Sequence, residues 1–270
     1  MQPNDIQWQK FYNEVFRKTG IDFNLYKAAQ LQRRIIGMAG QQGCADLDAF
    51  AVWLNKSPDN VAWFLDKMAI NVSELFRNPE KWVEMEKIVL PELLKQSPRL
   101  KIWSAGCSYG AEAHTMACIL DHKFPGTHTV LGTDIDIAAL DQARRSEFSS
   151  DDMKGVPSEY RKYFVPGEKG RYNAVPTLKR MLDFKRQNIL ADRFDRGFDL
   201  IMCRNVVIYF TDEAKDQLYR RFFEALKPGG ILFVGSTERI FKANEMGYET
   251  ALPFFYRKPK LGENRWRNAS

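Results

Sequence analysis

The pattern of the sequence changes near residue 100. From there onward, short apolar runs alternate with segments whose apolar residues recur at helical spacing. The apolar runs are LKIWSA, TVLGT, FDLIMC and ILFVGS, and the helical segments lie at 111–122, 136–146 and 212–226. This alternation is typical of a parallel sheet with helices on both faces. The sequence therefore predicts a doubly wound α/β domain over residues 99–270.

The first 70 residues show helical spacing only, together with residue types that begin and end helices. These residues are Gly20 after a first helix, Asn24 and Gly40 around a second helix from about Leu25 to Met38, and Asp46 and Ser57 before a third and a fourth. We predict a small all-helical domain over residues 1–70, followed by a linker and helix over 71–98.

Residues 151–190 interrupt the alternation with several Gly and Pro residues. They contain nine Lys or Arg against five Asp or Glu, so this stretch carries +4 of the chain's formal charge of +6. Such a basic surface either attracts an acidic partner or is simply solvated. We expect an inserted small antiparallel β-subdomain over residues 151–187.

The composition favours a cytoplasmic protein without a metal. The four cysteines lie far apart and there are only three histidines, so neither a disulfide framework nor a zinc site is indicated. No apolar stretch approaches the roughly 18 residues of a membrane helix, and the N-terminus carries Asp5 and lacks the apolar region of a signal peptide. We therefore expect no direct membrane insertion.

Residues 101–112, KIWSAGCSYGAE, place a turn of small residues directly after the first predicted strand. In open parallel sheets a ligand binds beyond the strand ends, and Ala105 and Gly106 leave the backbone open to it. The glycine spacing does not match a pyrophosphate cradle. Asp134 closes the next strand, where a carboxylate can accept hydrogen bonds from two ribose hydroxyls. The pair indicates a nucleoside without a diphosphate, such as S-adenosylmethionine; the alternative is a tight turn and a helix-capping Asp.

Seven segments extend this interpretation over nearly the whole chain. They are NVSELFRN at 71–78, SAGCSYGAE, GTDID, QNIL at 187–190, CRNVVIYF at 203–210, LKPGGILFVGSTE at 226–238 and a final FFYRK. In this order they resemble segments of the chemotaxis receptor methyltransferases. The resemblance implies a class I, Rossmann-like methyltransferase domain. It also implies an enzyme that transfers the methyl group of S-adenosylmethionine to glutamate side chains on the cytoplasmic helices of bacterial chemoreceptors, giving γ-glutamyl methyl esters and S-adenosylhomocysteine. We expect a monomer without a nucleic-acid partner.

The resemblance also implies which residues bind the cofactor. They are Asn71, Ser73, Arg77, Glu112, Asp134, Asn188, Asn205 and Val206. Asp134 suits the ribose hydroxyls, Asn188 suits the adenine edge, and Glu112 can accept from the methionyl ammonium. The sequence departs from the family pattern at Tyr109, where the family usually has Thr, and at Ser73, which keeps a hydroxyl.

The expected chemistry needs no general base. A glutamate is almost fully ionised near pH 7, and the methyl carbon of a sulfonium is already activated, so catalysis depends on positioning. Arg77 is the predicted holder of the acceptor carboxylate, because a guanidinium offers a planar fork. Tyr209 is the second catalytic candidate. The basic Lys27, Arg33 and Arg34 are candidates for receptor docking, with a solvated helix face as the alternative.

Two other functions are weighed against this one. A nucleic-acid methyltransferase would suit the pI near 9.0, but the loop RNVVIY lacks the prolines of a base-holding loop and the helical domain shows no recognition-helix motif. The altered turn at Tyr109 and Ala111 also fits a methyltransferase fold that binds without transferring a methyl group. Cofactor titration distinguishes the binding module, and acceptor identity distinguishes the nucleic-acid enzyme.

Overall fold

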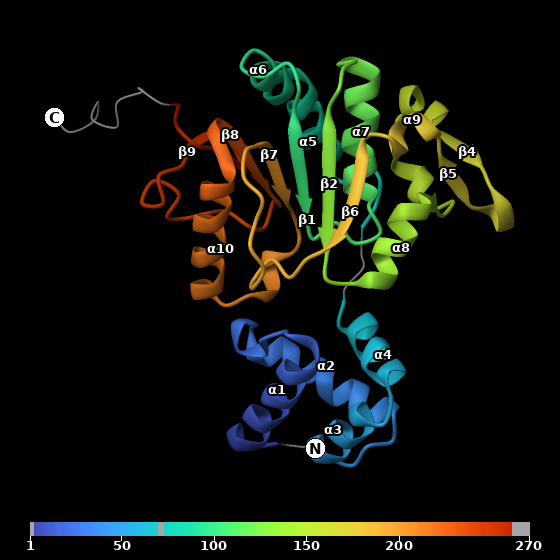
Figure 1. Cartoon of the computed structure of the whole chain (residues 1–270), viewed down its shortest axis with the longest axis vertical. Helices are drawn as coiled ribbons and strands as arrows, with labels where there is room; N and C mark the ends of the chain where they lie inside the picture. The colour runs from blue at the N-terminus through green and yellow to red at the C-terminus, as the bar shows by residue number, and fades with distance from the viewer. Residues whose placement is uncertain (1–2, 70–72, 261–270) are drawn as a thin grey trace. The chain divides into compact units, whose positions relative to one another are not determined.

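The computed structural model describes residues 3–69 and 73–260, and the chain divides into two compact units. One unit comprises Met1–Ile70 and Ile208–Gln217, and the other comprises Asn71–Val207 and Leu218–Ser270. Figure 1 shows the helices of the first unit and the helix-flanked sheet of the second. In the described parts of the chain, no helix has the length and apolar character needed to cross a membrane.

The helical unit begins and ends its helices mostly where the sequence predicts. Its helices are α1 (Asp5–Thr19), the 3-10 turn η1 (Phe23–Leu25), α2 (Ala28–Gln41), α3 (Leu47–Asn55) and α4 (Pro58–Met68). Gly20 ends α1 in the left-handed conformation with φ 72°. Asp46 accepts from the backbone N–H of Ala49, and Ser57 accepts from that of Asn60. These three predicted helix boundaries are confirmed.

The predicted bounds of the second helix are wrong. Asp22, not Asn24, caps η1, and α2 starts only at Ala28. Tyr26 and Lys27 are instead extended and pair with residues 209–211: the backbone N–H of Lys27 donates to the carbonyl of Tyr209 over 2.9 Å. Gly40 lies inside α2, and the chain turns at Gly43 with φ 67°.

The larger unit contains a seven-stranded sheet with the order β6-β2-β1-β7-β8-β10-β9. Its strands are β1 (Lys101–Ala105), β2 (Thr129–Asp134), β6 (Leu182–Arg186), β7 (Phe198–Cys203), β8 (Leu226–Val234), β9 (Glu249–Leu252) and β10 (Phe255–Arg257). The first five strands in this order pair in parallel, and β10 and β9 pair antiparallel at one edge.

Helices cover both faces of this sheet. They are α5 (Pro79–Glu84), which continues through the π-turn η2 (Met85–Val89) into α6 (Leu90–Leu94), and α7 (Ala111–Lys123), α8 (Ile137–Arg145) and α10 (Asp212–Ala225). Successive residues of β1 point to opposite faces. Ser104 contacts Glu112 of α7, whereas the Trp103 ring lies 5.3 Å from that of Phe222 in α10. The predicted doubly wound fold is therefore confirmed.

A second, small sheet is inserted between α8 and β6. It consists of β3 (Glu147–Phe148), β4 (Phe164–Pro166) and β5 (Tyr172–Ala174), which pair antiparallel in the order β3-β5-β4. Short turns accompany these strands: η3 (Asp152–Gly155), η4 (Ser158–Tyr163), η5 (Glu168–Gly170) and α9 (Pro176–Lys179). The predicted antiparallel insertion is confirmed, although β6, inside the predicted range 151–187, pairs with β2 in the main sheet.

Candidate active site

Most of the predicted cofactor residues lie at one edge of the main sheet. Ala105 ends β1, Asp134 ends β2, and Asn188 and Asn205 each follow the end of a strand by two residues. The carboxyl ends of parallel strands share one edge, where ligands bind in folds of this kind. Backbone hydrogen bonds tie these ends together, because Gly106 donates to the carbonyl of Thr133 and Gln187 donates to that of Asp134, each over 2.8 Å.

The turn after β1 requires glycine at two positions. Gly106 has φ 78°, and a Cβ atom built on it would lie 2.4 Å from Cγ2 of Val206. Gly110 has φ 84° and precedes α7, and a Cβ atom there would lie 2.9 Å from that of Ala143. Only glycine combines this backbone conformation with such close neighbours. The turn therefore brings the loop at Val206 into contact with the end of β1.

Asp134 is held with both carboxylate oxygens in defined positions. Oδ2 accepts from the backbone N–H of Ser108 over 2.7 Å, and Oδ1 accepts from that of Asp136 over 3.0 Å. Burial raises the pKa of Asp134, although these N–H groups act in the opposite direction. The cap of α8 is Asp136, which accepts from Ala138 and Ala139. Asp134 is therefore not the helix-capping residue, and each of its oxygens can accept a further hydrogen bond.

Asn188 lies in a tight turn after β6. Its side-chain oxygen Oδ1 accepts from the backbone N–H of Leu190 over 3.0 Å, and its backbone N–H donates to Oδ2 of Asp192 over 2.8 Å. The residue is almost fully buried. The turn lies beside the end of β2, because the backbone N–H of the neighbouring Gln187 donates to the carbonyl of Asp134.

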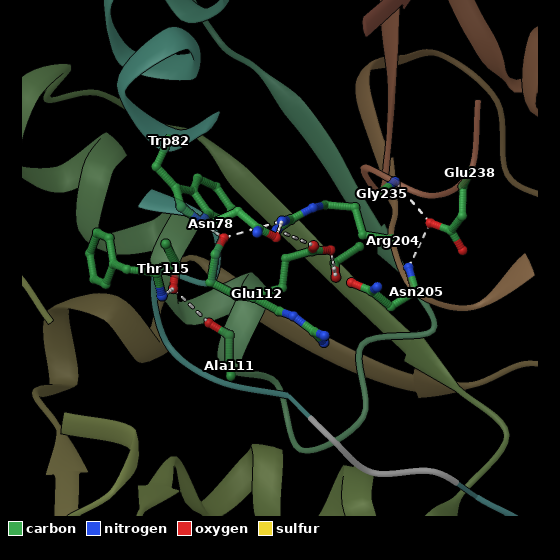
Figure 2. A network of polar contacts seen from close by, with 12 residues as sticks. Asn78, Trp82, Ala111, Glu112, Thr115, Arg204, Asn205, Gly235 and Glu238 are labelled. Carbon is green, nitrogen blue, oxygen red and sulfur yellow. Dashed lines mark hydrogen bonds and ion pairs between the residues drawn. The ribbon is translucent and has the colours of Figure 1, made fainter. Parts of the chain in front are cut away.

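Glu112 is the centre of a buried polar network between α7, β7 and the segment before α5 (Figure 2). Ser104 donates to its Oε1 atom over 2.7 Å, and Nη1 of Arg204 lies 3.4 Å from its Oε2 atom. The other end of the Arg204 guanidinium donates to Oδ1 of Asn78 over 2.8 Å and to the carbonyl of Arg77 over 3.1 Å. This network joins a predicted cofactor residue to the backbone of the predicted acceptor residue.

Glu238 shapes the loop that carries Asn205 and Val206. Its two carboxylate oxygens accept four backbone N–H groups, those of Asn205, Val206, Val207 and Gly235, over 2.6 to 3.0 Å. Asn205 is held with φ 61°. Burial raises the pKa of Glu238, and the four N–H groups lower it.

The segment at residues 73–77 is fastened to the rest of this unit. The Tyr109 hydroxyl lies 2.7 Å from Oδ1 of Asp152 in η3 and also contacts the carbonyl of Ser73. The backbone N–H of Phe76 donates to Oγ1 of Thr115 in α7 over 2.9 Å (Figure 2). Asn71, a further predicted cofactor residue, lies outside the described residues.

Tyr209 and the predicted docking residues belong to the helical unit and are described within it. Tyr209 ends the 3-10 turn η6 (Val207–Tyr209). Its carbonyl accepts a hydrogen bond from the backbone N–H of Lys27, which precedes α2. The guanidinium of Arg34 donates to the carbonyl of Lys67 at the end of α4 over 2.6 Å, so it connects two helices. Lys27 and Arg33 are exposed.

Two family models match this chain. The CheR methyltransferase, all-alpha domain matches residues 6–69, and the CheR methyltransferase, SAM binding domain matches residues 71–253. The chain belongs to the CheR methyltransferase family. The predicted family is thus confirmed, and the larger unit carries the S-adenosylmethionine-binding methyltransferase domain.

Relatives of the CheR family match along most of this chain. A chemotaxis protein methyltransferase from Listeria monocytogenes is 38% identical over 92% of this chain and 95% of that protein. One from Listeria innocua is 37% identical over the same shares. A chemotaxis protein methyltransferase from Escherichia coli is 26% identical over 87% of this chain and 85% of that protein.

The residues at the sheet edge fit the cofactor of a CheR domain. Beyond the bonds described above, the carboxylate of Asp134 could accept from a pair of hydroxyl donors, and that of Glu112 could accept from an ammonium group. Glycine at positions 106 and 110 of the turn between these two acceptors makes room for Val206 and Ala143, which a Cβ atom would meet. Acceptors of these two kinds suit the ribose hydroxyls and the methionyl ammonium of S-adenosylmethionine.

The sequence reasoning missed Arg204, Asn78 and Glu238. Arg204 and Glu238 both lie inside segments used for the resemblance, CRNVVIYF and LKPGGILFVGSTE, but their partners come from other parts of the chain. A charged residue in an otherwise apolar or small-residue segment was the available signal, because such a residue is rarely buried without a partner.

Proposed function

We propose that this chain transfers the methyl group of S-adenosylmethionine to glutamate carboxylates of bacterial chemoreceptors, producing γ-glutamyl methyl esters and S-adenosylhomocysteine. Its family and the chemotaxis names of its relatives support this proposal. The observation that carries it is the network from Glu112 through Arg204 to the backbone of Arg77. This network connects Glu112, a proposed cofactor residue, to the backbone of Arg77, whose cationic side chain is suited to a carboxylate acceptor.

The cofactor supplies an activated methyl carbon, so the protein's task is to hold an ionised carboxylate in line with it. A glutamate with an ordinary pKa of about 4.3 is ionised near pH 7 and needs no base. In the proposal, Arg77 binds one carboxylate oxygen and leaves the other to react, because a grip on both oxygens would weaken the nucleophile. Asp134, Asn188 and Glu112 fix the cofactor, and exclusion of water assists the union of opposite charges.

The helical unit has a proposed role in recognition. Lys27 and Arg33 are exposed cations that suit the acidic surroundings of receptor methylation sites. Arg34 contributes less directly, because its guanidinium already connects α2 to the end of α4. Tyr209 is proposed to orient the acceptor, and the cytoplasm is the compartment in which the receptor helices are reached.

Acceptor identity tests this function. The purified chain is mixed with methyl-labelled S-adenosylmethionine and, in separate reactions, with chemoreceptor-containing membranes, duplex DNA and RNA. We expect label on the receptor and on neither nucleic acid. Label on DNA or RNA would contradict the acceptor, and the absence of any label despite measured binding of S-adenosylhomocysteine would identify a binding module.

A further inference from the structure

We infer that Arg204 is a positioning residue that couples cofactor binding at Glu112 to the placement of Arg77. The inference rests on the proposed function, since that proposal assigns the cofactor to Glu112 and the acceptor to Arg77. It adds a residue with neither assignment, and it predicts that the two halves of the site are linked through one guanidinium.

The geometry of Arg204 suits this role. Nη1 lies 3.4 Å from Oε2 of Glu112 in α7, while Nη2 lies 2.8 Å from Oδ1 of Asn78 and 3.1 Å from the carbonyl oxygen of Arg77. Figure 2 shows the side chain extending from the end of β7 between Glu112 and Asn78. The planar fork of a guanidinium can hold both partners at once in a fixed relation.

The burial of Arg204 argues against a role in stability alone. Its side chain is 4% exposed, and its guanidinium lies over the rings of Phe233 and Trp82 at 4.7 and 5.6 Å. Its Nε atom has no partner among the residues that the structure describes. A buried ion pair with incomplete hydrogen bonding is often no more stabilising than apolar residues of similar volume. The presence of Arg204 at the strand ends is therefore better explained by its hold on Glu112 and on the backbone of Arg77.

The backbone around Arg77 is set in an unusual conformation by the same contacts. Phe76 and Asn78, on either side of Arg77, have φ 56° and 58°, a region that Phe rarely occupies and that Asn tolerates better. Asn78 precedes α5 without capping it through its side chain. That side chain accepts from Arg204 instead, and the indole of Trp82 also donates to the carbonyl of Arg77, over 3.0 Å. Strain of this kind persists where neighbouring contacts impose it.

These contacts predict that a ligand bound at Glu112 changes the stability of the segment around Arg77, which can be measured. Any shift of Glu112 when an ammonium binds it is transmitted to the peptide of Arg77 through one rigid group. Coupling between two sites through such a contact typically changes an equilibrium by about 5- to 150-fold. Lysine at position 204 would keep the charge but would lack the fork, so it could not hold Glu112 and Asn78 together.

The test compares Arg204→Lys with Arg257→Lys by hydrogen exchange and by binding of S-adenosylhomocysteine. Arg257 is a matched control because it also pairs with a carboxylate, that of Glu92, and also has a buried Nε atom without a partner among the described residues. In the parent and in Arg257→Lys, saturating S-adenosylhomocysteine should slow amide exchange across residues 74–82 by about tenfold. In Arg204→Lys, saturated to the same degree, S-adenosylhomocysteine should slow the exchange of these amides by less than about twofold.

The Asn78→Gly variant provides a second test that does not depend on the folding of Arg204→Lys. Glycine accepts the conformation of Asn78 and removes the side-chain acceptor, while the bond from Arg204 to the carbonyl of Arg77 is kept. This variant should bind S-adenosylhomocysteine within about twofold of the parent, yet lose part of the protection across 74–82 and lose methyl transfer by at least about tenfold. If Asn78 served folding alone, the variant would be less stable, but ligand binding and amide protection across 74–82 would fall together.

Two results would overturn the inference. One is equal protection of residues 74–82 in the parent and in Arg204→Lys or Asn78→Gly. The other is a loss of protection in Arg257→Lys as large as in Arg204→Lys. Protection in the parent without any labelling of receptors would instead reject the proposed acceptor and leave the coupling intact, so the two failures are distinguishable.

Discussion

The Oε2 atom of Glu238 lies 2.6 Å from the backbone nitrogen of Asn205, and the two carboxylate oxygens together accept four backbone N–H groups. This one side chain therefore defines the loop that follows β7. Gly235 is required beside it, because a Cβ atom there would lie 2.3 Å from Oε2 of Glu238.

Glu238→Gln should destabilise the protein and weaken cofactor binding. The amide has one acceptor oxygen, so about half of the buried N–H groups would lose their partner, at about 1–3 kcal/mol for each group. We expect the free energy of unfolding to fall by at least about 2 kcal/mol. Glu245→Gln, an exposed change in the segment between β8 and β9 that also carries Glu238, should stay within about 0.5 kcal/mol. Equal denaturation midpoints for both variants would contradict this account of the loop.

Tyr109→Phe should weaken the binding of S-adenosylhomocysteine by about three- to tenfold, because the segment at Ser73 loses the hydroxyl that fastens it. Tyr163→Phe is the matched control, since the Tyr163 hydroxyl makes a similar bond to Asp121 over 2.8 Å. Both variants should lose similar stability, about 1–2 kcal/mol, but only Tyr109→Phe should bind more weakly. Isothermal titration of both would show whether Tyr109 instead serves only as a packed ring.

Cofactor binding should weaken as the pH falls through the pKa of Asp134, which burial raises above its ordinary value. The ionised carboxylate accepts hydrogen bonds from ribose hydroxyls better than the protonated group does, so Asp134→Asn should bind the cofactor weakly and with a flatter pH profile.

The raised pKa of Asp134 also affects stability, because the folded protein holds this proton more tightly than the unfolded chain does. The stability contributed by Asp134 is thus present at low pH and is lost as the pH rises through the raised pKa.

Unfolding measurements on the protein without ligand check this sign. The free energy of unfolding of Asp134→Asn, relative to the parent, should increase as the pH rises from about 4. A relative stability that falls with rising pH would show that the pKa of Asp134 is lowered in the folded protein.

His114 should make the protein sensitive to acid. Its ring lies between Phe148 and Phe184, and burial lowers its pKa to about 4. Because the unfolded chain binds this proton more readily, stability should be lost as the pH falls from about 6.5 towards 4, by up to about 3 kcal/mol. His114→Phe keeps an aromatic ring and removes this loss. The same slope of unfolding free energy with pH in both proteins would contradict the assignment.

The sequence predicted the elements whose signals are local. Buried strands such as β7 are continuous apolar runs, and Gly20, Asp46 and Ser57 mark helix ends by their own chemistry. The start of α2 was wrong because residues 25–27 pair with a segment far along the chain. The strands β6 and β9 were missed because they are edge strands with largely exposed side chains and no continuous apolar run.

The candidate site was predictable to the extent that its residues end strands. Asp134, Asn188 and Asn205 meet at one edge because parallel strands share their carboxyl ends. The positions of Arg204 and Glu238 were not, since their roles depend on backbone groups and side chains that only the fold brings near. These partners lie far away along the chain, so the local sequence pattern does not indicate them.

The central claim is that the product is a carboxyl methyl ester on a receptor, and the chemistry of the labelled product tests it most directly. Receptors labelled by the parent and by Arg77→Ala are treated with mild alkali, and volatile methanol is collected. The account predicts that the parent's label leaves as methanol, and that Arg77→Ala binds S-adenosylhomocysteine within a few-fold of the parent but transfers at least about a hundredfold more slowly. Receptor label that resists alkali, or equal transfer by Arg77→Ala at saturating cofactor, would contradict it.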